Sequence, residues 1–158
     1  MRLGVLADTH IQTWPMKLLA QVKTHFQSAE LILHAGDIVN MSILEMLPLP
    51  VVAVAGNSDT SLVQLSLPRS QIVECRGFRI GLMHGYGAPQ EVPFLVAERF
   101  AGQKVDAIVF GHSHEPFNRE MNGVLMFNPG SLSGVRSEAR TLGILDLDDK
   151  IKGSIIEV

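Results

Sequence analysis

Seven side chains with metal-binding chemistry follow short apolar segments of the sequence. They are carboxylates, an amide and imidazoles: Asp8, His10, Asp37, Asn57, His84, His112 and His114. Oxygen and nitrogen donors without a thiolate suit borderline divalent ions such as Mn²⁺, Fe²⁺, Ni²⁺ or Zn²⁺. Because this set exceeds what one tetrahedral site needs, we expect two ions that share a bridging carboxylate.

The spacing of these donors suggests that some act in pairs. Asp8 and His10 are two residues apart, as are His112 and His114. In an extended chain such residues point to the same side. Each pair is therefore predicted to present two donors together.

The segments that precede the donors are predicted to be buried strands. They are rich in Val, Ile and Leu without strict alternation, which is typical of strands covered on both faces: Leu3–Ala7, Leu31–His34, Val51–Ala55, Phe78–His84 and Val105–Phe110. Loops at the carboxyl ends of strands in open sheets project into one crevice, so the donors should meet at one edge. Glycine precedes Asp37, Asn57 and His112, which indicates sharp turns or close backbone approach.

Helices and hairpins complete the expected architecture. Helices are predicted after Pro15 through Phe26, from Asn40 to Leu47, and from Pro93 to Ala101. Three short turn sequences separate apolar runs in the second half: Arg76-Gly77, Asn122-Gly123 and Asp148-Asp149-Lys150. A β-α-β-α-β beginning followed by antiparallel hairpins predicts two packed mixed sheets with helices outside.

Composition excludes several classes of protein. The chain is 46% hydrophobic and 18% charged, with a net charge of −3 and no basic block, which argues against disorder and against nucleic-acid or membrane-surface binding. Cys75, the single cysteine, has no internal disulfide partner. No segment has the length of a signal peptide core or a membrane span. We expect one cytoplasmic domain over residues 1–158.

Five short motifs, taken in order, resemble the signature of the calcineurin-like metallophosphoesterases. They are Asp8-Thr9-His10, Gly36-Asp37, Gly56-Asn57-Ser58-Asp59, His84-Gly85 and Gly111-His112-Ser113-His114. Asn128-Pro129-Gly130-Ser131 resembles a further motif of the small bacterial and archaeal phosphodiesterase branch, although it also fits a simple turn. The resemblance implies a four-layer αββα sandwich.

The resemblance also implies how the ligands divide. Asp8, His10 and His114 would hold the first ion, Asn57, His84 and His112 the second, and Asp37 would bridge them. Mn²⁺ is the expected metal. A hydroxide held between two ions about 3.5–4 Å apart would attack a small phosphate ester in line. All seven residues would thus be catalytic as well as metal-binding.

One residue departs from the usual family pattern. Ser58 follows the asparagine, where a histidine usually protonates the departing oxygen. Loss of a positioned general acid costs about 10²–10⁴-fold, so substrates with good leaving groups are favoured. The small phosphodiesterase branch shares this departure, which favours diesters over monoesters.

Other functions remain open from the sequence. The same site would serve a phosphomonoesterase or a nucleotide pyrophosphohydrolase, and the fold also occurs as a non-catalytic scaffold or could serve a nucleotide-binding regulator. The complete ligand set argues against the scaffold, and self-association stays open.

Several residues near the motifs have two interpretations. His34 either ends its strand or supports the ligands. Ser58 and Asp59 either close a turn or orient water, and Arg136 and Arg140 are either solvated or clamp a substrate phosphate.

Overall fold

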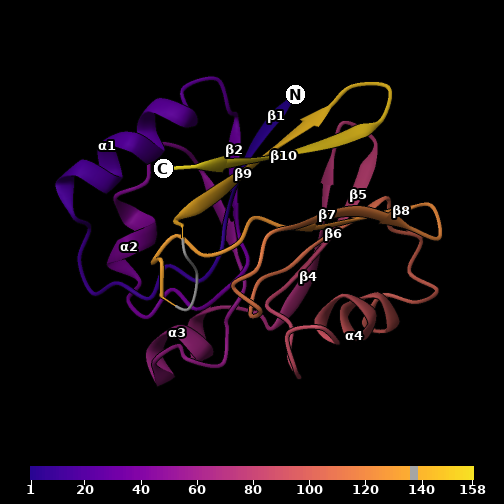
Figure 1. Ribbon diagram of the computed structural model, residues 1–158, viewed down its shortest axis with the longest axis horizontal. Helices are drawn as coiled ribbons and strands as arrows, with labels where there is room; N and C mark the ends of the chain where they lie inside the picture. Colours follow the sequence, from indigo (N-terminus) through magenta and orange to yellow (C-terminus); the bar gives the residue numbers. More distant parts are fainter. Residues whose placement is uncertain (136–138) are drawn as a thin grey trace.

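The computed structural model, which describes residues 1–135 and 139–158, contains two five-stranded mixed sheets (Figure 1). The first sheet has the order β10-β9-β1-β2-β3. Its strands are β1 (Arg2–Leu6), β2 (Leu31–His34), β3 (Val51–Ala53), β9 (Thr141–Leu147) and β10 (Ile151–Glu157). The first three are parallel, and the β9–β10 hairpin adds to β1 in antiparallel register.

The second sheet has the order β4-β5-β6-β8-β7. Its strands are β4 (Ser70–Cys75), β5 (Phe78–Met83), β6 (Ala107–Val109), β7 (Phe117–Met121) and β8 (Val124–Asn128). β5, β6 and β8 are parallel, whereas each edge strand forms a hairpin with its neighbour. Parallel strands therefore occupy the centre of this sheet, and their carboxyl ends lie at one edge.

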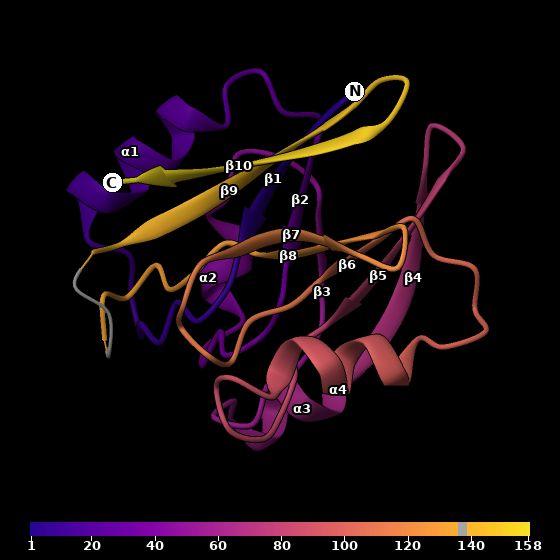
Figure 2. The ribbon, with the colours of Figure 1, turned by 45° about the vertical axis from the view of Figure 1, so that its right-hand side comes forward.

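Four layers follow from the way the apolar side chains pack (Figure 2). Helices α1 (Met16–His25) and α2 (Ser42–Glu45) cover the outer face of the first sheet, where Val22 and Ile43 pack with Ile32. Helix α4 (Val92–Arg99) covers the outer face of the second sheet. Between the sheets lies a third cluster that includes Val5, Leu33, Leu82, Val109 and Phe127. The predicted αββα sandwich is confirmed.

The predicted strands and turns agree closely with the structure. All five predicted strands are present, with ends shifted by at most two residues, and the three predicted hairpins are β4–β5, β7–β8 and β9–β10. The helix expected from Asn40 is a single turn, which begins as the Asn40 side chain accepts a hydrogen bond from the Ser42 N–H. Helix α3 (Ser61–Ser66) was not predicted, because only Val63 in it is buried and no apolar stripe marks it.

None of the helices in the described residues has both the length and the apolar character needed to cross a membrane.

Candidate metal centre

The seven predicted ligands all lie just beyond the carboxyl ends of parallel strands. Asp8 and His10 follow β1, Asp37 follows β2 and Asn57 follows β3 in the first sheet. In the second sheet, His84 follows β5, while His112 and His114 follow β6. Hydrogen bonds hold these loops together, from the Asp8 N–H to the Gly36 carbonyl and from the Gly111 N–H to the His84 carbonyl. One edge of the sandwich thus collects all seven side chains.

Asp8, His10 and His114 form the first ligand group. Their donor atoms lie within 4.8 Å of one another. Asp8 Oδ1 is 3.2 Å from His114 Nε2 and 3.7 Å from His10 Nε2, and the two Nε2 atoms are 3.2 Å apart. His114 Nδ1 donates to the Val135 carbonyl at 2.6 Å. That hydrogen bond fixes the tautomer, so the Nε2 lone pair faces the group.

Asp8, Asp37 and His84 form a second group that overlaps the first. His84 Nε2 is 3.3 Å from Asp37 Oδ2 and 3.9 Å from Asp8 Oδ1. Its Nδ1 donates to the Ala35 carbonyl at 2.8 Å, which again turns Nε2 toward the site. Asp37 Oδ2 is also 3.4 Å from His10 Nε2. This oxygen therefore lies between an imidazole of the first group and an imidazole of the second.

Asn57 and His112 lie beside the second group. His112 Nδ1 is 2.9 Å from Asn57 Oδ1, and its ring centroid is 5.2 Å from that of His84. The Asn57 amide donates to Ser58 Oγ at 3.2 Å, which directs Asn57 Oδ1 toward the histidine. Both side chains are more exposed than Asp8 or His84.

The expected pairing of His112 with His114 is wrong. His114 joins Asp8 and His10, whereas His112 lies with Asn57 and His84. The reason is the backbone, which is not extended here: φ is 70° at His112 and 61° at His114. The side chains of Asp8 and His10 do lie together, as predicted. Their backbone is not extended, however, since φ is 50° at Asp8 and 46° at His10.

Left-handed backbone at non-glycine residues is costly. It is confined to a few percent of such residues and costs about 1–3 kcal/mol where the surroundings enforce it. Five of the seven candidate ligands adopt it: Asp8, His10, Asp37, His112 and His114. Strain concentrated on these residues is typical of a functional site.

The glycines before the ligands are needed for close approach, as predicted. A Cβ on Gly56 would collide with the Asp37 carboxylate, and one on Gly111 would lie 2.7 Å from Asp8 Oδ2. Gly36 has a φ of 92°, and its Cβ would lie 2.9 Å from the Gly56 nitrogen. Only glycine permits these loops to pack this tightly.

Two buried polar atoms face the site without a hydrogen bond. Among the described residues, Asp8 Oδ1 and His84 Nε2 are inaccessible to solvent and have no hydrogen bond of good geometry. A buried unsatisfied group costs about 1–3 kcal/mol, and more when charged. A divalent cation would satisfy both atoms, so the residues fit a metal ion.

The charges of the site are strongly coupled. Burial acts to raise the pKa of Asp8, but contacts with His10 and His114 outweigh it and hold that pKa below its usual value. Burial also acts to raise the pKa of Asp37, but His84 and the Ser58 N–H outweigh it and hold that pKa below its usual value. Conversely, burial acts to lower the pKa of His84, whereas Asp37 and Asp8 raise it above that of an ordinary histidine. Both carboxylates are thus ionised at neutral pH.

His34 supports the ligand loops from below. It is completely buried, accepts a hydrogen bond from the Gly36 N–H on Nδ1 at 3.2 Å, and contacts Thr9 Oγ1 through Nε2 at 3.4 Å. The Thr9 hydroxyl in turn donates to the Asp37 carbonyl at 3.2 Å. Burial lowers the pKa of His34 to about 3, so the ring is neutral.

The Asn128 to Ser131 turn braces the ligand loops. Asn128 Nδ2 donates to the Gly111 carbonyl and to Ser113 Oγ, each at 3.0 Å. Ser131 Oγ donates to the Asp8 carbonyl at 3.0 Å. The sequence signalled a turn at this motif, but the partners of its side chains could not be predicted because they come from distant segments.

Two of the remaining residues with two interpretations make hydrogen bonds to nearby backbone groups. Asp59 accepts hydrogen bonds from the Val39 and Gly56 N–H groups at 2.6 and 2.7 Å, so it closes a turn. Arg140 donates to the Ser133 carbonyl at 3.3 Å in an exposed loop. Arg136 lies outside the described residues.

A mixed ββ sandwich with carboxylates, imidazoles and an amide gathered at its strand ends defines a metal-dependent phosphoesterase. The chain belongs to the calcineurin-like phosphoesterase superfamily, whose domain model matches residues 1–150. The resemblance of the five motifs is thereby confirmed.

Relatives and solved structures agree with this assignment. A probable metallophosphoesterase of Methanothermobacter thermautotrophicus is 36% identical over 163 residues, which span 99% of this chain and 92% of that protein. A phosphodiesterase of Methanocaldococcus jannaschii is 24% identical over 95% of each chain. An archaeal phosphodiesterase structure superposes with a TM-score of 0.82 at 25% identity, covering 100% of both chains. Vps29 of Chaetomium thermophilum shares the fold, with a TM-score of 0.77 at 18% identity and coverage of 99% and 96%.

Proposed function

We propose that the protein is a phosphodiesterase that works with two divalent ions, with Mn²⁺ as the expected metal. The observation that carries this proposal is the pair of overlapping ligand groups around Asp8, in which Asp8 Oδ1 and His84 Nε2 have no hydrogen bond among the described residues. The similarity to phosphodiesterases of archaea supports the diester preference.

The ligands divide between two positions. Asp8, His10 and His114 would hold the first ion, Asn57, His84 and His112 would hold the second, and Asp37 would be shared by both. When bound, two such ions supply Lewis acidity, an activated water and a template for in-line displacement at phosphorus. The domain over residues 1–158 provides all seven ligands.

The chain prepares these ligands through hydrogen bonds to their far sides. The carbonyls of Ala35 and Val135 accept the Nδ1 protons of His84 and His114, so Nε2 is the nitrogen of each ring that would bind a metal. The Ser58 N–H donates to Asp37 Oδ1 at 2.8 Å, and Oδ2 remains directed at His10 and His84. These contacts set the ligand positions before any ion binds.

Ser58 accounts for the expected diester preference. The Ser58 side chain is exposed, and its hydroxyl accepts a hydrogen bond from the Asn57 amide. This position therefore has no imidazole that could protonate a departing alkoxide. Departing groups that need no proton, such as phenolates, should therefore react fastest. Water would protonate poorer leaving groups at a cost of about 10²–10⁴-fold relative to a positioned acid.

The test compares bis-p-nitrophenyl phosphate with p-nitrophenyl phosphate on metal-stripped protein refilled with Mn²⁺, Fe²⁺, Ni²⁺ or Zn²⁺. We expect turnover to return with metal, to be highest with Mn²⁺, and to favour the diester. The Ser58→His variant should gain most on diesters with an alkyl leaving group. A preference for the monoester would instead assign a phosphomonoesterase.

A folded, metal-loaded protein without turnover of any phosphate ester would favour the scaffold or a nucleotide-binding regulator. The fold alone does not separate these functions, because Vps29 shares it. Cytoplasmic location and self-association stay predictions from the sequence.

A further inference from the structure

A second, larger pocket adjoins the metal centre. Its volume is about 570 Å³, which is within the range of small-molecule sites. Asn57 and His84, both proposed ligands of the second ion, form part of its lining. A smaller pocket of about 300 Å³ lies over the ligands and shares Asn57 with it. A substrate held at the metals can therefore extend one of its arms into the larger space.

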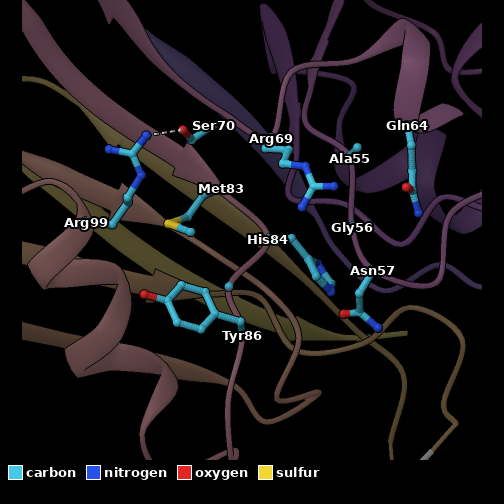
Figure 3. A pocket seen from close by; sticks show the side chains of 11 residues that line it. Ala55, Gly56, Asn57, Gln64, Arg69, Ser70, Met83, His84, Tyr86 and Arg99 are labelled. Atoms are coloured by element: carbon cyan, nitrogen blue, oxygen red, sulfur yellow. Dashed lines mark hydrogen bonds between the residues drawn. The ribbon is translucent and has the colours of Figure 1, made fainter.

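Two arginines line this larger pocket, which we name the arginine pocket. Arg69 immediately precedes β4, and Arg99 is the last residue of α4. Figure 3 shows Asn57 and His84 at one end of the pocket and Arg99 beside Ser70 at the other. Arg69 lies between them, on the side of His84. Cationic groups thus lie along the path that leads away from the metal centre.

Neither arginine has an ion-pair partner among residues 1–135 and 139–158. Elsewhere Arg2 and Arg79 form ion pairs with Asp146 and Glu74 at 2.7 and 2.6 Å. Within the described part of the chain, Arg69 and Arg99 have no such partner, and no carboxylate lines the pocket. The Arg99 guanidinium donates to Ser70 Oγ at 3.5 Å, a neutral partner. In a chain of net charge −3, two uncompensated guanidinium groups on one pocket favour an anionic occupant.

The rest of the pocket supplies apolar and aromatic surface. Met83 is buried, and Tyr86 is 49% exposed, so that much of the Tyr86 ring is available for contact. Figure 3 shows both side chains between the Arg99 end and the His84 end. A thioether and an aromatic ring suit a planar heterocycle, which can stack on the tyrosine.

We propose that the arginine pocket binds a second phosphate on one arm of the substrate. The substrate class is then a nucleotide diester in which the nucleoside carries a further phosphate: the diester sits at the metals, the base lies along Met83 and Tyr86, and the second phosphate contacts Arg69 and Arg99. Arginine binds phosphate oxygens bidentately, which gives direction as well as charge. This inference rests on the proposed function, because it assigns an arm of the same substrate.

The test uses two substrates with the same leaving group. Thymidine 5′-(p-nitrophenyl phosphate) and its 3′-phosphorylated form differ only in the second phosphate. With the Mn²⁺-loaded protein, we expect KM to be about tenfold lower for the phosphorylated form, because two charge-assisted contacts at an open, solvent-screened site give a modest gain. Arg69→Met and Arg99→Met should each reduce that ratio several-fold.

Arg76→Met is the matched control. Arg76 is exposed in the β4–β5 turn, at the other end of β4 from Arg69. The six residues of β4 span about 20 Å, which exceeds the screening length of about 8 Å at physiological salt. This variant removes the same charge from the protein, and the KM ratio should stay as in the wild type.

Equal KM values for the two substrates in the wild type, or a ratio that survives both pocket substitutions, would overturn the inference. A calorimetric measurement keeps it separable from the proposed function. Metal-loaded protein that hydrolyses neither substrate should still bind thymidine 3′,5′-bisphosphate about tenfold more tightly than thymidine 5′-monophosphate, with the excess lost in Arg69→Met and Arg99→Met. Equal binding of the two nucleotides would refute the pocket assignment whatever the turnover.

Discussion

Replacing His34 should change how the stability of the metal-free protein depends on pH. His34 is completely buried, and burial lowers its pKa from 6.5 to about 3. The unfolded chain therefore binds a proton at this residue between these two pH values, whereas the folded chain does not. Because stability rises with pH wherever the unfolded state binds more protons, His34 makes the fold less stable as pH falls from about 6.5 toward 3.

The size of this effect follows from the same pKa values. Each pH unit in the window is worth about 1.4 kcal/mol. Between neutral pH and pH 5, the contribution of His34 falls by about 2 kcal/mol, and by pH 3 by about 4 kcal/mol, because the folded-state ring begins to bind its own proton near pH 3. Solvent screening does not reduce this contribution, because the His34 side chain is 0% exposed. A loss of 2 kcal/mol is a large part of the stability of a typical domain.

His34→Asn isolates this contribution. The asparagine oxygen can still accept the Gly36 N–H that His34 Nδ1 accepts now. The smaller side chain leaves a cavity and should cost about 1–3 kcal/mol at neutral pH. That cost is independent of pH, so the test compares slopes and not absolute stabilities.

The assay is chemical denaturation of both proteins in a chelating buffer at pH 7.5, 6 and 5. The wild type should lose about 2 kcal/mol more than His34→Asn between pH 7.5 and pH 5. Titration of Asp8, Asp37 and His84 contributes to both curves and cancels to first order in the difference. Parallel curves would show that His34 titrates normally in the folded protein and would refute the neutral, buried ring.

Three further predictions concern the metals. Adding Mn²⁺ at about 100 times its dissociation constant should stabilise the protein by about 2.7 kcal/mol, seen as a rise in Tm of roughly 5–10 °C that a chelator reverses; no shift would contradict the fit of Asp8 Oδ1 and His84 Nε2 to a cation. Asp37→Asn should lower turnover by more than the roughly 10–100-fold loss that is typical when an outer hydrogen-bond partner of a metal ligand is removed. Circular dichroism should show an intact fold. Normal turnover would show that Asp37 is not part of the site. Gly56→Ala should weaken metal binding in a calorimetric titration, since its Cβ would meet the Asp37 carboxylate, and unchanged affinity would show that the loop relaxes freely.

The architecture could be predicted from local patterns. Strands such as β1 and β2 are short apolar runs, and the Asn122-Gly123 turn marks the β7–β8 hairpin without any knowledge of tertiary contacts. Helix α3 was missed because prediction from local patterns depends on an apolar stripe, which this helix lacks. Leu62 and Leu65 are 68% and 88% exposed, so its sequence lacks the apolar periodicity that marks the other helices.

That the seven candidate donors gather at one edge could be predicted, but their mutual geometry could not. Residue types and their positions after strands indicated all seven donors, whereas their division depends on contacts across the whole chain. The N–H of His112 donates to Asp8 Oδ2 at 3.0 Å, although the two residues are 104 positions apart. Asn128 fixes the same turn from β8. The resulting left-handed backbone separates His112 from His114, and no local pattern signals it.

The carboxylates of Asp8 and Asp37 are arranged in the same way, which would link the folding of the loops to the proposed metal binding. Asp8 accepts the His112 N–H on Oδ2 and directs Oδ1 at the imidazoles, and Asp37 accepts the Ser58 N–H on Oδ1 and directs Oδ2 at them. Each side chain thus fastens a neighbouring loop with one oxygen and offers the other to an ion. An asparagine at either position can keep its oxygen on the backbone N–H, which places its NH₂ group toward the metals. Because an amide nitrogen has protons and no free lone pair for a cation, these substitutions should separate the two roles: the loops stay in place, and the site loses a ligand and a negative charge.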